Sequence, residues 1–176
     1  MRRRSGFVAG WILVAVAAAA GGAYVSRTSA QPAGDAALEA RLTRLEDMEA
    51  IRRLLIEYGR TFDARDFAAY GALFAPDGVW QGGGGASYTG PDAIQQMVER
   101  AFPPSFYPNS HHVMTSIAID VTGPNSAIAW SRWTFVVEGE DGLPQPLRGG
   151  RYEDELVRVD GQWKFKSRRV IAELNG

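Results

Sequence analysis

The sequence predicts an α+β domain in which helices come first and a mostly antiparallel sheet follows. Apolar residues recur every three or four positions from Leu38 to Phe62, as in a helix that is buried on one side. From His111 onward the apolar pattern has a period of two, which is typical of strands with one buried face. Asp160-Gly161 separates two such segments and indicates a tight hairpin. Helices packed on one face of a sheet would bury both patterns.

The first 30 residues predict export. Met1–Gly6 is basic, Phe7–Val25 is an apolar run of 19 residues, and small residues follow up to Ala30. This pattern indicates a signal peptide cleaved after Ala30, or a single-span anchor in the inner membrane formed by residues 7–25. Either way we expect a periplasmic, secreted or anchored protein that touches the membrane only through this segment. Residues 31–37 would form a linker.

Composition excludes several classes of function. Residues 1–30 contain four arginines and no acid, so the remaining 15 basic and 20 acidic side chains give the domain a net charge of −5. This charge argues against nucleic acid as a partner. The absence of cysteine excludes disulfides and thiolate metal sites. With only two histidines, which are adjacent and would point to opposite faces of a strand, we expect no metal site. A hydrophobic content of 45% suffices for a core with an apolar pocket.

Three helices are expected. The first covers residues 38–62, and we expect its early part to pack on the same domain; a partner helix or a stalk from the membrane is the alternative. Asp63–Asp66 is a polar corner, in which Asp66 is suited to cap a second helix that ends at about Phe74. A third helix covers Asp92–Ala101, directly after a proline.

Strands and loops make up the rest of the chain. Val79-Trp80 begins a short strand, and the glycine-rich stretch Gln81–Gly90 lacks the Lys-Ser/Thr of a phosphate loop and is expected to be a flexible turn. Phe102–Ser110 is either a lid over a pocket or an ordered connecting loop. The four longer predicted strands are His111–Thr122, Ala127–Glu138, Gly149–Val159 and Gln162–Val170.

Tyr58 and Asp63 are the first candidates for chemistry. Tyr58 shares the apolar face of its helix with Leu55 and Phe62, whereas Asp63 lies roughly 100° from that face. If the helix ends at the corner, Asp63 could turn under the sheet and act as a base in an apolar cavity. The alternative, which the pattern alone favours, is a solvated carboxylate on the surface.

His112 is the better candidate of the two histidines. It shares a strand face with Met114 and Ser116, and this mixture of polar, small and apolar side chains is typical of a ligand pocket. His111 shares the other face with Val113 and Ile117, which looks the more obviously buried one and counts against this choice.

Five further residues are expected to contact a substrate. One inward-pointing arginine, Arg132 or Arg168, could bind a carboxylate or enolate oxygen. Most arginines of the last strands should instead be solvated or paired across the sheet with Glu153, Asp154 or Glu155. The apolar contacts are expected from Trp80, Met114 and Trp130.

The order of these motifs resembles the SnoaL-like branch of the nuclear-transport-factor-2-like superfamily. The similar segments include Ile51–Tyr58, Phe62-Asp63, Phe67–Trp80 and His111–Val113, and the closing stretch GGRYEDELVRVDGQWKFKSRRV. The resemblance covers about residues 38–171 and places the domain at 38–172. It implies a cone-shaped barrel, in which a strongly curved, mixed sheet wraps around helices and encloses an apolar pocket, and a homodimer formed through the outer face of the sheet.

The resemblance also implies a function. A bile acid 7α-dehydratase of this superfamily uses a Tyr, an Asp five residues later and a His on the first long strand, which Tyr58, Asp63 and His112 match in order. Scytalone dehydratase is similar but has a second catalytic His; the corresponding strand here offers Arg132 or Thr134. A dehydratase or isomerase without cofactor is therefore expected, acting by acid–base catalysis on a small apolar ring with hydroxyl or keto groups. The alternative is an exported, non-catalytic domain that binds a ligand or assists a partner.

Overall fold

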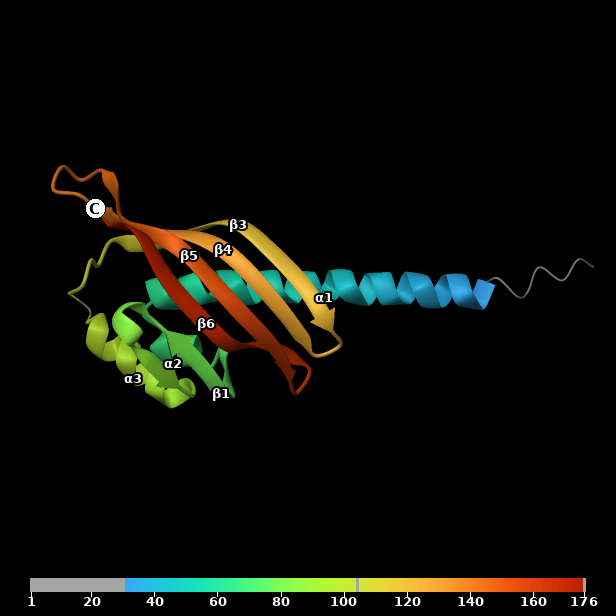
Figure 1. Cartoon of the computed structure of the whole chain (residues 1–176). Coiled ribbons are helices and arrows are strands. Elements are labelled where there is room, and N and C mark those ends of the chain that lie inside the picture. Colours follow the sequence, from blue (N-terminus) through green and yellow to red (C-terminus); the bar gives the residue numbers. More distant parts are fainter. Residues whose placement is uncertain (1–30, 104, 176) are drawn as a thin grey trace, which may run out of the picture.

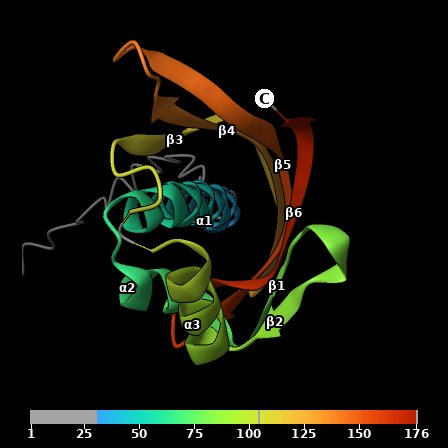
Figure 2. The ribbon, with the colours of Figure 1, turned by 90° about the vertical axis from the view of Figure 1, so that its left-hand side faces the viewer.

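The computed structural model describes residues 31–103 and 105–175, which form an α+β domain (Figure 1). The helices are α1 (Gln31–Asp63), α2 (Phe67–Gly71) and α3 (Pro91–Ala101), with a short 3₁₀ turn at Gly83–Gly85. The strands are β1 (Phe74–Gln81), β2 (Ser87–Thr89), β3 (Ser110–Gly123), β4 (Ser126–Glu138), β5 (Pro144–Val159) and β6 (Gln162–Asn175). Figure 2 shows the sheet curving around α1, with α2 and α3 on the same side.

The six strands form one mixed sheet in the order β2-β1-β6-β5-β4-β3. Only β1 and β6 are parallel, and all other neighbours are antiparallel. The sheet is strongly curved but does not close, because β2 and β3 remain as edges. The predicted fold class is confirmed: a curved, mostly antiparallel sheet wraps around the N-terminal helices.

The hairpin between β5 and β6 forms where the sequence predicts it. Val159 pairs with Gln162, and Asp160 and Gly161 between them have φ angles of 49° and 78°. Two consecutive positive φ angles are characteristic of the type I′ turn that suits the twist of an antiparallel pair.

The apolar stripe of α1 is buried only in its second half. Ile51, Leu55 and Tyr58 are at most 4% exposed and pack under the sheet. The first half of α1 extends past the strands (Figure 1), and Leu38 and Leu45 are more than 60% exposed. The expectation that this part packs on its own domain is therefore wrong, since the sheet is too short to cover it.

Some predicted boundaries differ from the structure. Residues 31–37, expected to be a linker, are helical and continuous with the rest of α1. The second helix ends at Gly71, and β1 begins at Phe74, because Phe74 pairs with Phe165 of β6 and is buried there. The glycine-rich turn contains β2 at the edge of the sheet.

A β-bulge changes which face of β3 is buried. The pairing with β4 shifts between Thr115 and Ala118, and Ser116 has a φ of 50°. Before the bulge His112 points inward, and after it Ile119 does. The two competing interpretations of this strand were therefore each correct for one half of it.

No helix in the described part of the chain is long and apolar enough to cross a bilayer. The apolar segment 7–25 lies outside the described residues, so the signal peptide or anchor stays a prediction.

Candidate active site

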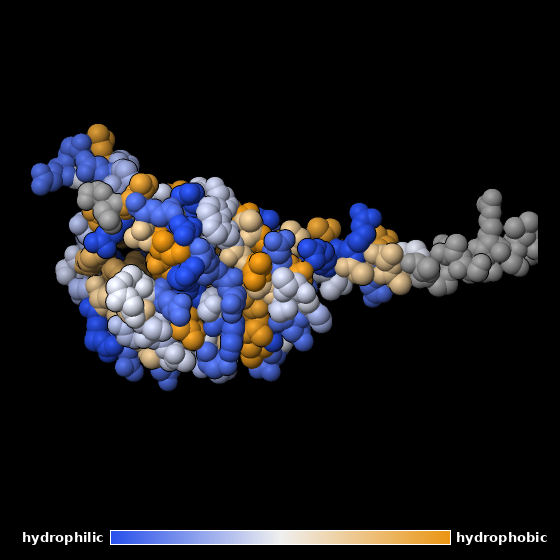
Figure 3. Space-filling view, viewed as in Figure 1, coloured by the Kyte–Doolittle hydropathy of each residue, from blue (hydrophilic) through white to orange (hydrophobic). Residues whose placement is uncertain are grey.

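A cavity of about 600 Å³ lies between the concave face of the sheet and the helices. Figure 3 shows a hollow at the end of the molecule that is remote from the protruding part of α1. Ten of the residues that line the cavity are aromatic, which suits a flat apolar ligand. They are Tyr58, Phe62, Tyr70, Trp80, Phe102, Phe106, Tyr107, Trp133, Phe135 and Tyr152.

Asp63 and His112 form a hydrogen-bonded pair at the wall of this cavity. The Asp63 carboxylate accepts from the His112 backbone N–H at 2.9 Å and lies 2.7 Å from Nδ1 of the ring. The His112 ring lines the cavity, and its side chain is only 9% exposed. The tautomer that donates its Nδ1 proton to Asp63 leaves Nε2 with a lone pair, which can take a proton from a ligand.

The local backbone explains this contact. α1 ends at Asp63, and Arg65 adopts a φ of 58°, which stops the helix and turns the chain toward α2. Asp66 then caps α2 by accepting from the Ala69 N–H at 3.0 Å, as predicted. Gly59 lets β3 come close to α1, because a Cβ there would lie 3.2 Å from Cβ of His112. Asp63 therefore turns under the strand and is not a surface carboxylate.

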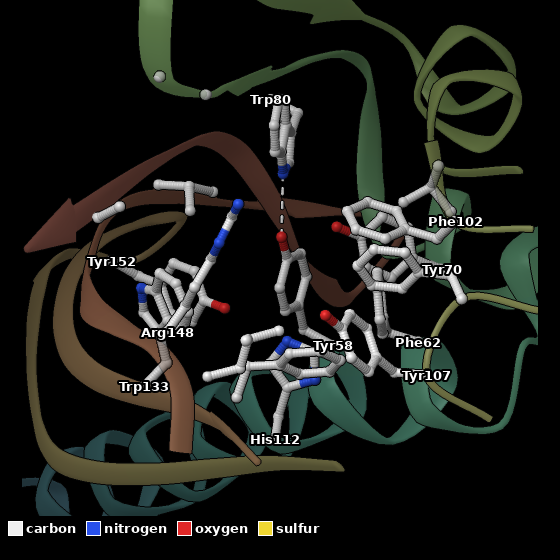
Figure 4. A pocket seen from close by; sticks show the side chains of 18 residues that line it. Tyr58, Phe62, Tyr70, Trp80, Phe102, Tyr107, His112, Trp133, Arg148 and Tyr152 are labelled. Carbon is white, nitrogen blue, oxygen red and sulfur yellow. Dashed lines mark hydrogen bonds between the residues drawn. The ribbon is translucent and has the colours of Figure 1, made fainter. Parts of the chain in front are cut away.

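Tyr58 presents its hydroxyl inside the same cavity (Figure 4). The oxygen accepts a hydrogen bond from Trp80 Nε1 at 2.9 Å. Burial raises the pKa of Tyr58, although the nearby Arg168 opposes this shift. The hydroxyl therefore stays protonated at neutral pH, and its hydrogen is available to donate to a ligand oxygen.

Buried tyrosines make stability fall at alkaline pH. Burial also raises the pKa of Tyr70 and Tyr152 well above the usual value. Above about pH 10 the unfolded chain loses these protons while the folded chain keeps them, so the free energy of unfolding should fall by about 1.4 kcal/mol per pH unit for each tyrosine. Urea denaturation at increasing alkaline pH measures this slope. Tyr152→Phe should make it shallower, and an unchanged slope would contradict this account.

Arg168 lies behind the cavity wall and does not line the cavity, so its expected contact with a substrate is corrected. Its side chain is fully buried and binds both oxygens of Asp154 at 2.7 Å. The guanidinium also stacks 4.0–4.2 Å from the ring centres of Tyr58, Tyr152 and Phe165. Arg168 therefore supports the aromatic wall from below, as the pairing across the sheet predicted for most arginines.

Arg132 and Trp130 lie on the outer face of the sheet, contrary to their expected role. Arg132 is exposed, stacks on Trp130 and contacts Glu173 at 2.8 Å. The inward residues of β4 are the odd-numbered ones, and Trp133 and Phe135 line the cavity. Aromatic residues occur on both faces of this strand, so its alternation did not show which face is inside.

Met114 and Trp80 were both expected to contact a substrate, but only Trp80 lines the cavity. Met114 points inward but packs on the core opposite Trp133, outside the cavity lining. Trp80 lines the cavity and also donates a hydrogen bond to Tyr58, and its contact with a substrate stays a prediction.

The loop after α3 forms part of the cavity wall. Phe106 and Tyr107 line the cavity, and their carbonyl oxygens accept hydrogen bonds from Nη2 of Arg65. The same corner that positions Asp63 therefore also holds this loop. Within the described ranges, no group of three or more His, Asp and Glu side chains is placed to hold a metal ion.

The curved sheet and its cavity agree with the family that a comparison of the sequence identifies. The model of the SnoaL-like domain family matches residues 43–169, and the chain belongs to this family, within the nuclear-transport-factor-2-like superfamily. No curated protein sequence matches the chain.

Solved structures with the same fold include two from Novosphingobium aromaticivorans. One is named "Putative Scytalone Dehydratase"; it is 29% identical, with a TM-score of 0.66, and the match covers 76% of this chain and 89% of that one. The other is an NTF2-like protein with a cystatin-like fold, 26% identical over 75% of this chain and 85% of that one, with a TM-score of 0.67. A hexachlorocyclohexane dehydrochlorinase, LinA type 2, is 20% identical over 76% and 90% of the two chains, with a TM-score of 0.67, and shows the fold alone.

Proposed function

We propose that this protein is a lyase or isomerase of the dehydratase type that needs no cofactor. Its substrate would be a small apolar ring compound with hydroxyl and keto groups. The observation that carries the proposal is the His112 ring, which contacts Asp63 through Nδ1 and lines an aromatic cavity together with Tyr58. A base, its orienting carboxylate and a hydrogen-bond donor are the parts that this chemistry requires. The 29% identical structure that is named after scytalone dehydratase supports the same class.

In the dehydratase reaction, Nε2 of His112 takes a proton from the carbon next to the substrate's carbonyl group. The electron pair of the broken C–H bond moves onto the carbonyl oxygen as an enolate, and Tyr58 donates a hydrogen bond to that oxygen. The enolate then forms a C=C bond as the β-hydroxyl leaves, and the proton held by His112 goes to this hydroxyl to give water. Asp63 stabilises the imidazolium between the two proton transfers.

The isomerase reaction uses the same groups. Here the proton on His112 returns to a different carbon of the enolate, and no group leaves. The two reactions therefore differ in the substituents of the substrate and not in the catalytic residues.

Native mass spectrometry of the full-length protein, followed by turnover assays, tests this proposal. A co-purified ligand should be a small ring compound that fits about 600 Å³. Hydroxy-ketones and steroid-like ketones should then release water or shift a double bond when the protein is added. A ligand that binds but is never converted would contradict catalysis and indicate a binding domain.

We also propose that residues 1–30 direct export of the protein and that it forms a homodimer through the outer face of its sheet. The outer face of the sheet exposes Val113 and Ile128, which are 39% and 50% accessible and could pack against a second copy. Sedimentation of the full-length chain should show a dimer, and Ile128→Asp should shift it to a monomer. Leu143→Asp, in the exposed β4–β5 connection, is the control. A wild-type monomer would overturn this part.

A further inference from the structure

Arg148 is a cation in the cavity wall that the mechanism above does not use. It lines the cavity on the side of Trp133 and Tyr152 (Figure 4). Within residues 31–103 and 105–175, no acidic side chain lines the cavity, and Arg148 makes no ion pair or side-chain hydrogen bond. Other arginines of the sheet are paired, as Arg168 is with Asp154. The cavity therefore has an unmatched positive charge at its rim.

The backbone directs this side chain into the cavity. Phe135 pairs with Arg148, but the next residue of β4, Val136, pairs with Pro146, so Leu147 is an extra residue in β5. Arg148 shares the inward face of its partner Phe135, and the bulge adds Leu147 beside it, so that two consecutive residues line the cavity. Such bulges re-aim side chains next to functional sites.

The residues after Arg148 allow this geometry. A Cβ at Gly150 would lie 2.0 Å from the carbonyl oxygen of Ile171, so no larger residue fits there without a shift of the backbone. The pairing of β5 with β6 is also irregular between Gly149 and Gly150.

Arg148 and His112 lie in one row across the sheet. His112 pairs with Phe135 of β4, and Phe135 pairs with Arg148 of β5. Two strand spacings separate the two backbones by about 9.5 Å. A single or fused ring can fill this distance, with one end at the guanidinium and a carbon at the imidazole.

We propose that Arg148 binds a carboxylate of the substrate, so that the substrate is a small ring acid. This inference rests on the proposed function and narrows its substrate class. A guanidinium donates two parallel hydrogen bonds to a planar carboxylate. A dianionic phosphate would leave one charge unmatched beside a single arginine. Because Arg148 is exposed, water screens the interaction, and we expect about a three- to fivefold gain in affinity.

Isothermal titration of the full-length protein with naphthoate and naphthylmethanol tests this inference. The two probes share a ring and differ in the carboxylate. The titration is run at about pH 8, where histidine side chains are ordinarily neutral. The wild type should bind naphthoate about three- to fivefold more tightly than naphthylmethanol.

Three variants test whether Arg148 causes the preference for naphthoate. Arg148→Met should lose it while keeping its affinity for naphthylmethanol, which also shows that the variant is folded; Arg148→Lys should keep part of it. Arg132→Met, which removes an arginine from the outer face, should keep all of it. A wild type without the preference, or Arg148→Met with it, would overturn the inference.

The same titration separates this inference from the proposed function. His112→Gln should abolish turnover but keep the preference for naphthoate, because the carboxylate is bound at the other end of the cavity. If no substrate is ever converted, the proposed function fails while the preference for naphthoate can still be measured.

Discussion

Replacing His112 with glutamine is expected to lower kcat by about 10²- to 10⁴-fold, the range typical of a lost general base. Glutamine keeps a polar side chain of similar size at the wall of the cavity, but it cannot take a proton from carbon. KM should change much less, because the aromatic walls that bind the ring remain. The measurement is steady-state turnover of whichever hydroxy-ketone the full-length protein converts.

His111→Gln is the matched control for this experiment. His111 is the adjacent residue of β3, and it is exposed on the opposite face of the strand. Its replacement should leave kcat and KM unchanged. Equal losses in the two variants, or full activity in His112→Gln, would remove His112 from the mechanism.

Removing Asp154 is expected to have the largest effect on stability. Burial alone would lower the pKa of Arg168, but the Asp154 carboxylate outweighs this and raises it, so Arg168 carries its positive charge. Asp154→Ala would leave a buried guanidinium without a counter-ion. The loss of unfolding free energy should be about 3–5 kcal/mol, as for other buried pairs that lose one partner. Urea denaturation measures it.

Glu173→Ala is the control for this prediction. Glu173 contacts Arg132 and Arg151 on the outer surface. Exposed ion pairs contribute at most about 1 kcal/mol, because water screens them. If Asp154→Ala costs no more than Glu173→Ala, the buried pair does not stabilise the fold.

The fold could be predicted well because its signals are local. The change in period from α1 to β3, the capping residue Asp66 and the hairpin at Asp160-Gly161 each fix one element without knowledge of the others. The end of α2 could not be predicted, because burial of Phe74 against Phe165 overrides the helical pattern.

The candidate site could be predicted only in part. The sequence suggested Tyr58, Asp63 and His112, and the structure places them around one cavity or directly behind its wall. Only the end of α1 and the approach of β3 at Gly59 decide that Asp63 turns inward.

The arginines show what alternation alone cannot resolve. Arg132 was expected to bind a substrate but lies on the outer face of the sheet. Arg168 is paired with Asp154 and does not reach the cavity. Arg148 shares the inward face of β5 with Tyr152 by ordinary alternation, but the sequence did not show which of the arginines of the last strands faces the cavity.

The most direct test of the central claim is the double variant Asp63→Asn/His112→Gln. If Asp63 acts only by orienting His112 and stabilising its charged form, the two residues work as one unit. The kcat of the double variant should then equal that of His112→Gln within about twofold, although Asp63→Asn alone is strongly impaired. Losses that multiply in the double variant would show that the two residues act independently and would contradict the account.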